Sequence, residues 1–413
     1  GEFWVFWMTA LSATDARSST RTLRLQLSRG DKADVGTAQL GGRISEGENV
    51  VRKNVNYESV TSATSESGDE GGQLKNERVE RAFPPGLLNL GNTCYFNSVL
   101  QVLYHLKSFR NALSEWNPPE DADPYRVALA LSLKRLFVQM EDVERRNVSQ
   151  SIPPNHFLSV LREQNSDFTG YDQEDAHEFL RFLLDKVSDA FRASRPSSNP
   201  NQAYQQISKR PRKSSEENPL QKLFEGVGAT YTRCFECDTV KRREESFLDV
   251  SLPVQSGSSL SWALSQQVQR ETLADKYDCE LCLTKTEAEQ WWQLDSVPPV
   301  VTLHLKLFTY DRNIQGKVAA SVRCPQSICF SRWCSNGSGE SMYQLDAVIV
   351  HEGSTMTSGH YYAYVNENGW YCFDDSDVSM IDEAALRRKL FTPVKPKKTA
   401  YLLFYRKTDL ESR

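Results

Sequence analysis

Two Cys-x-x-Cys pairs constrain the fold of this chain more than any other feature of its sequence: Cys234 with Cys237, and Cys279 with Cys282. Each pair is typical of one half of a tetrahedral zinc site, and four thiolates leave such a site no open position for water. Because the pairs stand roughly forty residues apart, the chain between them must leave the site and return, which predicts a strand excursion. The alternative interpretations are that one pair is redox-active or that both pairs are incidental. We therefore expect one structural zinc ion and no catalytic cofactor.

The composition of the 413-residue chain argues against several classes of protein. A net charge of −5 disfavours a nucleic-acid-binding surface, and no stretch of about 18 apolar residues is present to span a membrane. The apolar opening at residues 3–7 is short and has no basic residues before it, so we do not interpret it as a signal peptide. Nine cysteines without such a signal indicate a reducing compartment, namely the cytoplasm, the nucleus or both.

Composition and periodicity also divide the chain. Residues 1–82 are rich in Ser, Thr, Gly and charge, which predicts disorder. Residues 83–193 carry helical periodicity, and the polar, Pro-rich residues 194–219 with their basic run predict a disordered surface insertion. From residue 224 onward strand patterns dominate, and residues 408–413 form a tail. Helices followed by strands are typical of the α+β class.

Apolar residues at helical spacing mark three helices. Their apolar positions are Phe96, Val99, Leu100, Leu103 and Leu106 in the first, Val127, Ala130, Leu131, Leu133, Phe137 and Met140 in the second, and Ala176, Phe179, Leu180, Leu183, Leu184 and Val187 in the third. For the first helix we expect a single apolar stripe, and for the third we expect Asp172 to cap the N-terminus. Alternation with a period of two predicts strands at 301–307, 343–350 and 401–406.

Cys94 stands at the mouth of the first of these helices, just after a Gly-Asn turn and five residues after Asn89. The positive end of the helix dipole favours a thiolate there, and the thiolate is the form of cysteine that attacks carbonyl groups. The side-chain amide of Asn89 is placed to donate a hydrogen bond to the oxyanion that such an attack creates. A buried structural cysteine that packs like a small hydrophobic residue is the alternative interpretation.

A predicted hairpin supplies partners for this thiol. Its two strands flank the turn signal Asn-Glu-Asn-Gly, and a centre between Glu367 and Asn368 puts His360 opposite Asp374 and Asp375. A carboxylate across a hairpin fixes the tautomer of the imidazole and favours its protonated form. This is the base and orienting half of a catalytic triad. A plain surface pair of histidine and aspartate is the alternative interpretation.

The remaining histidines and cysteines indicate no second site. Structural roles are expected for four histidines without an evident partner: His105, His156, His304 and His351. Free thiols in a polar loop are expected at Cys324, Cys329 and Cys334, and a packed strand residue at Cys372.

Together these motifs resemble those of the ubiquitin-specific proteases, a family of papain-like cysteine deubiquitinases. The resemblance rests on four segments in the family's order: residues 86–101 around Cys94, residues 171–179 with the sequence Tyr-Asp-Gln-Glu-Asp-Ala-His-Glu-Phe, the two Cys-x-x-Cys pairs, and residues 359–375 around His360. It implies a catalytic domain shaped like a right hand at residues 83–407. A helical thumb would span about residues 83–223, zinc-bearing fingers about 224–297, and a palm about 298–407.

The resemblance also implies a division of catalytic roles. It makes Cys94 the nucleophile, His360 the general base, and Asp374 the acid that orients the histidine. Asn89 would serve the oxyanion hole, and Asp375 would either support the oxyanion or take over the orienting role.

Four further residues are implied to contact the substrate. Asp175 and Glu178 would meet the basic C-terminal tail of ubiquitin, because carboxylates pair well with arginine. Tyr361 and Gly359 would line the narrow channel that admits the Gly-Gly end of this tail. Ordinary negative charge in the first turn of a helix is the alternative interpretation for the two acids.

Longer runs resemble a subgroup of the family. Residues 152–154, 247–250, 277–282 and 303–306 look like the small ubiquitin-specific proteases that are weak alone and are stimulated by a WD40-repeat activator docked on the fingers. Leu307 departs from the family, which usually has arginine there.

The implied function is hydrolysis of the isopeptide or peptide bond at the C-terminal glycine of ubiquitin, with ubiquitinated proteins as substrates and no nucleic acid or membrane as partner. One alternative is a catalytically weak, ubiquitin-binding scaffold. Another is a zinc-ribbon module that binds nucleic acid, which the balanced charges around the cysteine pairs disfavour.

Overall fold

The computed structural model describes residues 83–168, 172–193, 218–311, 314–318, 321–335, 341–355, 358–391 and 398–408. The disorder predicted for residues 1–82 lies outside the described residues, as do most of the insertion and nearly all of the tail. The insertion was expected to end at residue 219, but Asn218 and Pro219 already belong to a helix start. The Asn218 side chain accepts a hydrogen bond from the Leu220 N–H at 2.9 Å and caps this helix.

Helices come first along the chain. They are α1 Cys94–His105, α2 Lys107–Glu115, α3 Pro124–Arg145, α4 Asn155–Gln164, α5 Ala176–Ala193 and α6 Pro219–Phe224, with a 3₁₀ turn, η1, at Ser166–Phe168. The start of α3 is set by a side-chain cap and a proline. The Asp123 carboxylate accepts a hydrogen bond from the Tyr125 N–H at 3.0 Å, and Pro124 occupies the first turn, where its missing N–H costs nothing.

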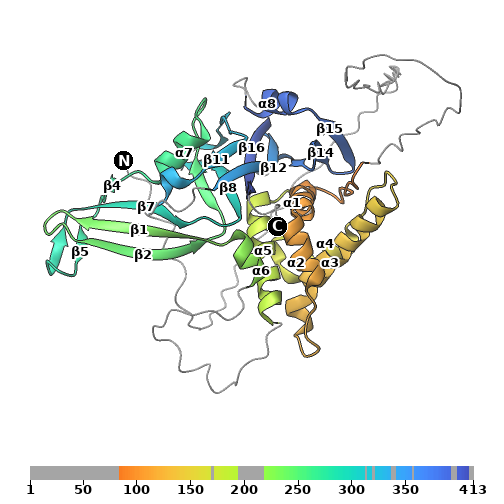
Figure 1. The fold of residues 1–413 in the computed structure, drawn as a ribbon, viewed down its shortest axis with the longest axis horizontal. Coiled ribbons are helices and arrows are strands. Elements are labelled where there is room, and N and C mark those ends of the chain that lie inside the picture. The colour runs from red at the N-terminus through yellow and green to blue at the C-terminus, as the bar shows by residue number, and fades with distance from the viewer. Residues whose placement is uncertain are drawn as a thin grey trace, which may run out of the picture. The chain divides into compact units, whose positions relative to one another are not determined.

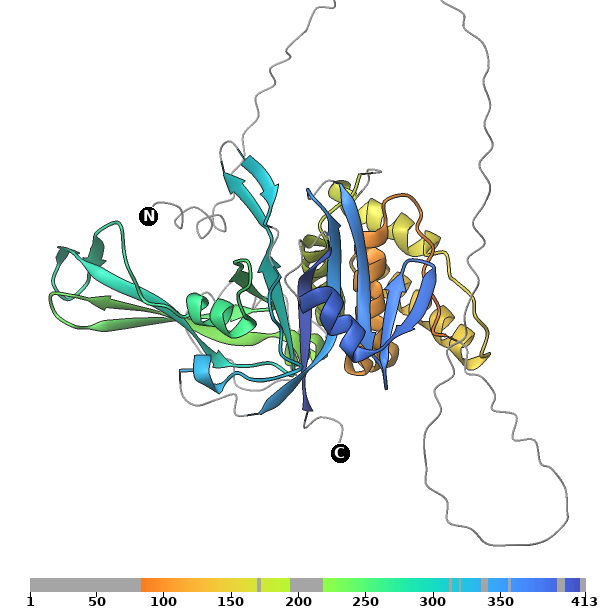
Figure 2. The same ribbon diagram turned by 90° about the horizontal axis from the view of Figure 1, so that it is seen from above.

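The helix α1 is buried on every side, so its burial extends beyond the predicted apolar stripe, whose five residues all lie in the core. Even Asn97, Ser98, Gln101 and His105 are buried along with its apolar residues. The reason is the position of α1, which packs against α5 on one side and against strand β13 (Gly359–Asn366) on another. Figure 2 shows α1 lying between the strands and the other helices.

A four-stranded antiparallel sheet in the order β2-β1-β7-β4 follows the helices. Its strands are β1 Gly226–Cys234, β2 Val240–Phe247, β4 Glu271–Thr272 and β7 Ala288–Ser296. The long strands lead away from the helices toward a small hairpin of β5 Tyr277–Cys279 and β6 Thr284–Thr286 (Figure 1). This is the strand excursion that the spacing of the cysteine pairs predicted.

An eight-stranded sheet faces α1. Its strand order is β15-β14-β13-β12-β16-β8-β3, with β11 paired to β12. The strands not yet given are β3 Val250–Pro253, β8 Val300–Lys306, β11 Ser327–Cys329, β12 Met342–Gly353, β14 Trp370–Asp374, β15 Asp377–Ile381 and β16 Lys398–Lys407. The strands predicted at 301–307, 343–350 and 401–406 are thus present as β8, β12 and β16.

One strand of the range expected for the fingers belongs to this larger sheet. β3 runs parallel to β8, with Val250 beside Leu303 and Leu252 beside Leu305. These four side chains are buried. Their burial explains why β3 pairs with β8 in the eight-stranded sheet and not with the four-stranded sheet.

The smaller elements are a hairpin of β9 Phe308–Asp311 and β10 Ile314–Lys317, the 3₁₀ turn η3 Ser331–Trp333, and two helices among the strands, α7 Leu260–Gln267 and α8 Glu383–Phe391. One apolar core runs from the helices into the eight-stranded sheet. No helix in the described part of the chain is long and apolar enough to cross a bilayer.

Candidate active site

Cys94 is the first residue of α1, and a tight loop in front of it sets its position. Gly91 and Asn92 in this loop have positive φ angles of 101° and 52°, which glycine and asparagine tolerate best. The Asn89 side-chain oxygen accepts backbone hydrogen bonds from Gly91 at 3.0 Å and from Thr93 at 3.2 Å. The Cys94 thiol is therefore held at the positive end of the α1 dipole, and its side chain is buried.

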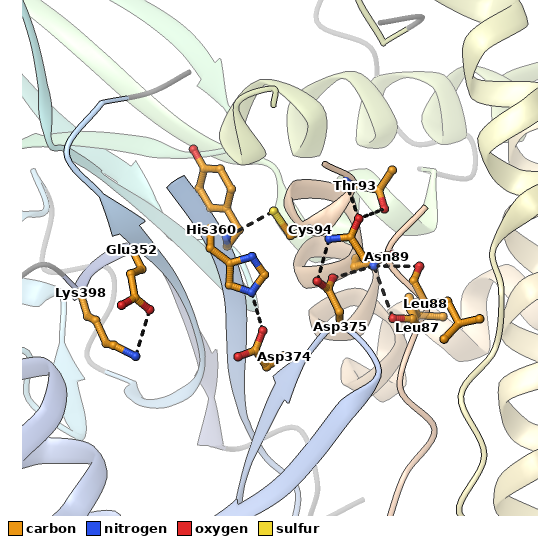
Figure 3. Close-up of polar contacts among 12 residues, drawn as sticks. Leu87, Leu88, Asn89, Thr93, Cys94, Glu352, His360, Asp374, Asp375 and Lys398 are labelled. Atoms are coloured by element: carbon orange, nitrogen blue, oxygen red, sulfur yellow. Dashed lines mark hydrogen bonds and ion pairs between the residues drawn. The ribbon is translucent and has the colours of Figure 1, made fainter. Parts of the chain in front are cut away.

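Asn89, Asn97 and Asp375 form a second hydrogen-bonded unit beside the thiol (Figure 3). The Asn89 amide donates to one oxygen of the Asp375 carboxylate and the Asn97 amide donates to the other, both at 2.8 Å. No role was predicted for Asn97, although it stands three residues after Cys94 and so shares a face of α1. The Asp375 carboxylate thus holds the Asn89 side chain rather than the imidazole.

His360 on β13 lies between the Cys94 sulfur and the Asp374 carboxylate at the end of β14 (Figure 3). The distance from His360 Nε2 to Asp374 Oδ1 is 2.5 Å. The hydrogen bond to Asp374, and then the one to Cys94, raise the pKa of His360 to about 10 against the opposing effect of burial. An imidazolium beside the thiol at neutral pH is the charge state that a thiolate nucleophile requires.

The register of the β13–β14 hairpin differs by one residue from the prediction. The ladder pairs Ala363 with Phe373 and Asn366 with Trp370, so the hairpin is centred on Asn368 and not between Glu367 and Asn368. The cause is a three-residue turn in which Asn368 has a φ of 57° and Gly369 a φ of 141°. His360 still reaches Asp374, because both lie beyond the last ladder pair, where the turn after β14 begins.

The Cys94 sulfur has two further donors. The Tyr361 backbone N–H donates to it at 3.5 Å, and the Gln173 side-chain amide donates to it at 3.7 Å. Sequence reasoning missed Gln173, which lies in the loop before α5 and is 8% exposed. The sequence did contain a sign of a special role, because Gln173 is the one uncharged residue in the acidic run of residues 172–175.

The cap of α5 is Asp175, so the expectation of a cap by Asp172 was wrong. Asp175 Oδ1 accepts the backbone N–H groups of His177 at 2.7 Å and Glu178 at 3.1 Å. The other oxygen accepts the Tyr401 hydroxyl of β16 at 2.5 Å. Asp175 stands directly before the first helical residue, whereas Asp172 is too far along the chain to reach these groups. The predicted contact of Asp175 with the substrate stays a prediction, as does that of the exposed Glu178.

Gly359 is exposed beside the site and has no room for a side chain. A Cβ atom there would lie 2.4 Å from His351 Nε2 and 2.6 Å from the Glu352 carbonyl oxygen. Tyr361 is buried, with its ring 4.8 Å from that of His351 and 5.9 Å from that of Tyr401. The role predicted for Gly359 and Tyr361 in a substrate channel stays a prediction.

Several histidines without an evident partner in the sequence have partners in space. His105 Nδ1 lies 2.8 Å from Glu367 Oε2, and His156 contacts Arg135 at 3.4 Å. His304 Nδ1 bonds the Ser251 hydroxyl at 2.9 Å, and its ring stacks on His177 with 3.9 Å between centroids. His177 in turn lies 2.9 Å from the Asp249 carboxylate. All nine cysteines fall in the described residues and are free of disulfides.

The four cysteines of the Cys-x-x-Cys pairs converge at the tip of the four-stranded sheet. Their sulfur atoms all lie within 4.8 Å of one another. The distance from Cys234 to Cys282 is 3.9 Å and that from Cys237 to Cys279 is 3.7 Å. A tetrahedral zinc ion with metal–sulfur bonds of about 2.3 Å needs sulfur–sulfur distances of about 3.8 Å, so the four thiols fit this ion.

Known proteins of one family match this chain. The sequence profile described as ubiquitin carboxyl-terminal hydrolase covers residues 85–405. Ubiquitin carboxyl-terminal hydrolase 12 of Salmo salar is 34% identical over 339 residues, which make up 78% of this chain and 90% of that protein. Ubiquitin carboxyl-terminal hydrolase 4 of Arabidopsis thaliana is 34% identical over 325 residues, or 75% of this chain and 87% of that protein.

Two solved structures share the fold. One, from the SAGA Ubp8/Sgf11/Sus1/Sgf73 DUB module bound to monoubiquitin, matches with a TM-score of 0.64 at 25% identity and covers 78% of this chain and 69% of that chain. The other, from the same module bound to ubiquitin aldehyde, matches with a TM-score of 0.64 at 24% identity. It covers 80% of this chain and 70% of that chain. The α+β fold expected from the sequence is confirmed.

Proposed function

Because this chain belongs to the ubiquitin carboxyl-terminal hydrolase family and is a deubiquitinase of the cysteine type, we propose that Cys94, His360 and Asp374 form its catalytic triad. The observation that carries the assignment is their alignment. A buried thiol at a helix N-terminus faces an imidazole whose far nitrogen lies 2.5 Å from a carboxylate. This is the order of nucleophile, base and orienting group that thiol hydrolysis needs.

In the first half of the reaction, the Cys94 thiolate attacks the carbonyl carbon of the last glycine of ubiquitin. The carbon–sulfur bond forms as the carbonyl electrons move to oxygen. The His360 imidazolium then gives its proton to the departing lysine amine, and the carbon–nitrogen bond breaks to leave a thioester. Asp374 keeps the ring in the orientation that serves both transfers.

In the second half, water attacks the thioester carbonyl while neutral His360 removes a proton from it. The carbon–sulfur bond breaks, ubiquitin leaves with a free carboxylate, and the thiolate–imidazolium pair is restored. No metal takes part in either half.

The oxyanion that forms in each half requires donors fixed in advance. The Asn89 amide nitrogen carries two hydrogens, and one of them is committed to Asp375. We assign the second hydrogen to the oxyanion. The Asp375 carboxylate, held also by Asn97, is then the group that keeps this donor in place before the substrate arrives.

Substrate selection is proposed to follow from shape and charge. Gly359 is exposed at the edge of the site and brings no side chain there, which suits a Gly-Gly tail. Glu178, exposed in the first turn of α5, supplies a carboxylate for the basic part of that tail. Asp175 already accepts three hydrogen bonds, so its support for the tail is through the position of α5.

We propose zinc as the ion of the four-cysteine cluster, with a structural role, because four sulfur ligands leave no open position. The cluster joins the β1–β2 turn to the β5–β6 turn and holds the tip of the four-stranded sheet together. Nine free cysteines support a reducing location, in the cytoplasm, the nucleus or both.

A WD40-repeat activator is proposed to dock on this tip. Large apolar side chains are exposed around the cluster, with Leu283 at 86% and Leu281 at 67%, and with Phe235 and Val240 nearby in sequence to Cys237. Apolar groups gathered at one exposed end of a protein mark an interaction surface. The structurally similar Ubp8 is itself in a module with Sgf11, Sus1 and Sgf73, which supports the binding of partner proteins by this fold.

Turnover of a fluorogenic amide of the ubiquitin C-terminus tests the function. We expect wild type to release the fluorophore, Cys94→Ala to be inactive, and Cys329→Ala to match wild type, because Cys329 lies on β11 away from the site. A WD40-repeat activator should raise turnover of wild type. Ubiquitin binding without turnover under both conditions would instead identify a scaffold.

A further inference from the structure

The Cys94 sulfur is buried, and a buried thiolate needs donors as well as a cation. Cys94 is 3% exposed, so little water reaches its sulfur. An anion in such surroundings is costly unless hydrogen bonds replace those it made to water. The described donors besides the imidazole are the Tyr361 backbone N–H at 3.5 Å and the Gln173 amide at 3.7 Å.

The loop that carries Gln173 is fastened by the residues that follow it. Gln173 lies two residues before Asp175, whose carboxylate both caps α5 and accepts the Tyr401 hydroxyl of β16. Just beyond, His177 of α5 pairs with the buried Asp249, at 2.9 Å. The short loop that carries Gln173 is therefore fastened both to a helix and to the large sheet, and the amide is itself buried. A buried donor on a fastened loop loses little conformational entropy when it binds an anion.

Gln173 has an uncharged amide, whereas its neighbours in the sequence are acidic. Asp172, Glu174 and Asp175 surround Gln173 in sequence, and burial together with the nearby acids raises the pKa of Glu174. A carboxylate aimed at the sulfur would repel a thiolate, whereas an amide attracts it through an N–H dipole. The one neutral side chain of this acidic loop is the one that contacts the nucleophile.

We infer that Gln173 is a further catalytic residue, whose side-chain N–H stabilises the Cys94 thiolate before attack and again when the thioester is cleaved. The inference rests on the proposed function insofar as Cys94 is the nucleophile. No bond to Gln173 forms or breaks, and its contribution is electrostatic.

The test is the pH dependence of Cys94 alkylation by iodoacetamide, read by mass spectrometry of the Cys94 peptide in the full chain. Gln173→Leu keeps the bulk and removes the donor. We expect the pH at half-maximal rate to rise by about one unit and kcat/KM to fall about tenfold to a hundredfold. Gln173→Glu has nearly the same shape and adds a negative charge, so its midpoint should rise further.

The matched control is Gln101→Leu. Gln101 is a buried glutamine of α1 whose amide donates to the Pro85 carbonyl at 2.9 Å and not to the sulfur. We expect it to lose thermal stability and keep the wild-type alkylation midpoint. A wild-type midpoint in both Gln173 variants, each folded by its thermal transition, would overturn the inference.

Alkylation needs no ubiquitin, so the two proposals can fail separately. A raised midpoint in the Gln173 variants of an enzyme that does not cleave the ubiquitin amide would support the role of Gln173 and overturn the proposed function. Cleavage by wild type with unchanged midpoints would support the function and overturn the role of Gln173.

Discussion

Two neighbouring aspartates show how much depends on single residues in this site. Asp374 ends β14 and faces His360 at 2.5 Å. Asp375 follows with a φ of 51°, which turns the chain, and its carboxylate is bound by Asn89 and Asn97. In the proposed mechanism the adjacent acids therefore have different roles, Asp374 through the base and Asp375 through the oxyanion donor.

Exchanging each acid for its amide separates these roles. Asp374→Asn should lower kcat about a hundredfold to ten-thousandfold, because the imidazole loses the partner that fixes its tautomer. Asp375→Asn should lower kcat about tenfold to a hundredfold, because Asn89 remains but is held less firmly. Steady-state hydrolysis of the ubiquitin amide measures both effects, and equal losses in the two variants would contradict the assignment.

The pH profile of kcat/KM offers a second test at this scale. The pKa of His360 is raised to about 10 by Asp374 and Cys94, so activity should fall on the alkaline side only as pH approaches that value. The raised pKa of His360 also contributes to the free energy of unfolding. This contribution is fully present below pH 6.5 and is lost as the pH rises toward 10. In Asp374→Asn the alkaline limb should move to lower pH, and an unmoved limb would argue against this ion pair.

At the scale of elements, the start of α5 links the helices to the large sheet through one carboxylate. Asp175 caps the helix with one oxygen and binds the Tyr401 hydroxyl with the other. The loop with Gln173 depends on this link, because it immediately precedes the cap. A single side chain therefore joins helix stability to the surroundings of the nucleophile.

Asp175→Ala should lower the free energy of unfolding by about 2–4 kcal/mol, through loss of the cap and of the hydrogen bond from the buried Tyr401 hydroxyl. Tyr401→Phe removes the hydrogen bond between the sheet and Asp175 and should cost less, since the cap remains. Denaturant unfolding of the two variants measures the difference. A greater loss in Tyr401→Phe would show that the cap contributes little.

The tip of the four-stranded sheet is the second element whose form depends on a few side chains. We expect one zinc ion per chain, released by a strong chelator and absent in Cys282→Ser. Because the tip at β5 lies away from α1 and β14, which carry Cys94 and Asp374 (Figure 1), loss of the ion should raise KM more than it lowers kcat. A chromophoric zinc indicator measures the content, with Cys329→Ser as the control that keeps its metal. Full zinc content in Cys282→Ser would refute the site.

At the scale of the whole molecule, His304 joins helix α5 to the large sheet, and His351 is buried among the strands. His304 of β8 stacks on His177 of α5, and burial, followed by the charge of His177, lowers the pKa of His304 to about 3. Burial, followed by the charges of Lys317 and His360, lowers the pKa of His351 to about 3 as well. Burial alone would raise the pKa of Asp249, but its hydrogen bond with His177 and the neighbouring positive charges lower it overall.

These shifts predict acid sensitivity. Below pH 6.5 the unfolded chain binds protons at His304 and His351, whereas the folded chain binds them only near pH 3. The free energy of unfolding therefore decreases as the pH is lowered across this interval. The slope contributed by each histidine is at most about 1.4 kcal/mol per pH unit. His304→Gln should reduce the slope measured by denaturant unfolding, whereas His156→Gln, at an exposed site, should not. Equal slopes in the three proteins would contradict the prediction.

Local patterns in the sequence were sufficient for much of this molecule. The helical periodicity marked α1, α3 and α5, the alternation marked β8, β12 and β16, and the cysteine spacing marked a site that converges in space. The sequence also singled out Cys94 and His360, the thiol and the imidazole that the structure brings together. These features depend on side-chain chemistry and on spacing within one element, and both can be read along the chain.

Tertiary structure alone decided the rest. The pairing of Asp374 with His360 and of Asp375 with Asn89 depends on a positive φ at Asp375 and on a hairpin shifted by one residue. The contact of Gln173 with the sulfur joins residues that are 79 positions apart. Periodicity cannot distinguish adjacent residues in a turn or contacts between distant segments, because both are set by how helices and sheets pack. The sequence by itself thus determined which groups are present, and packing determined which group acts on which.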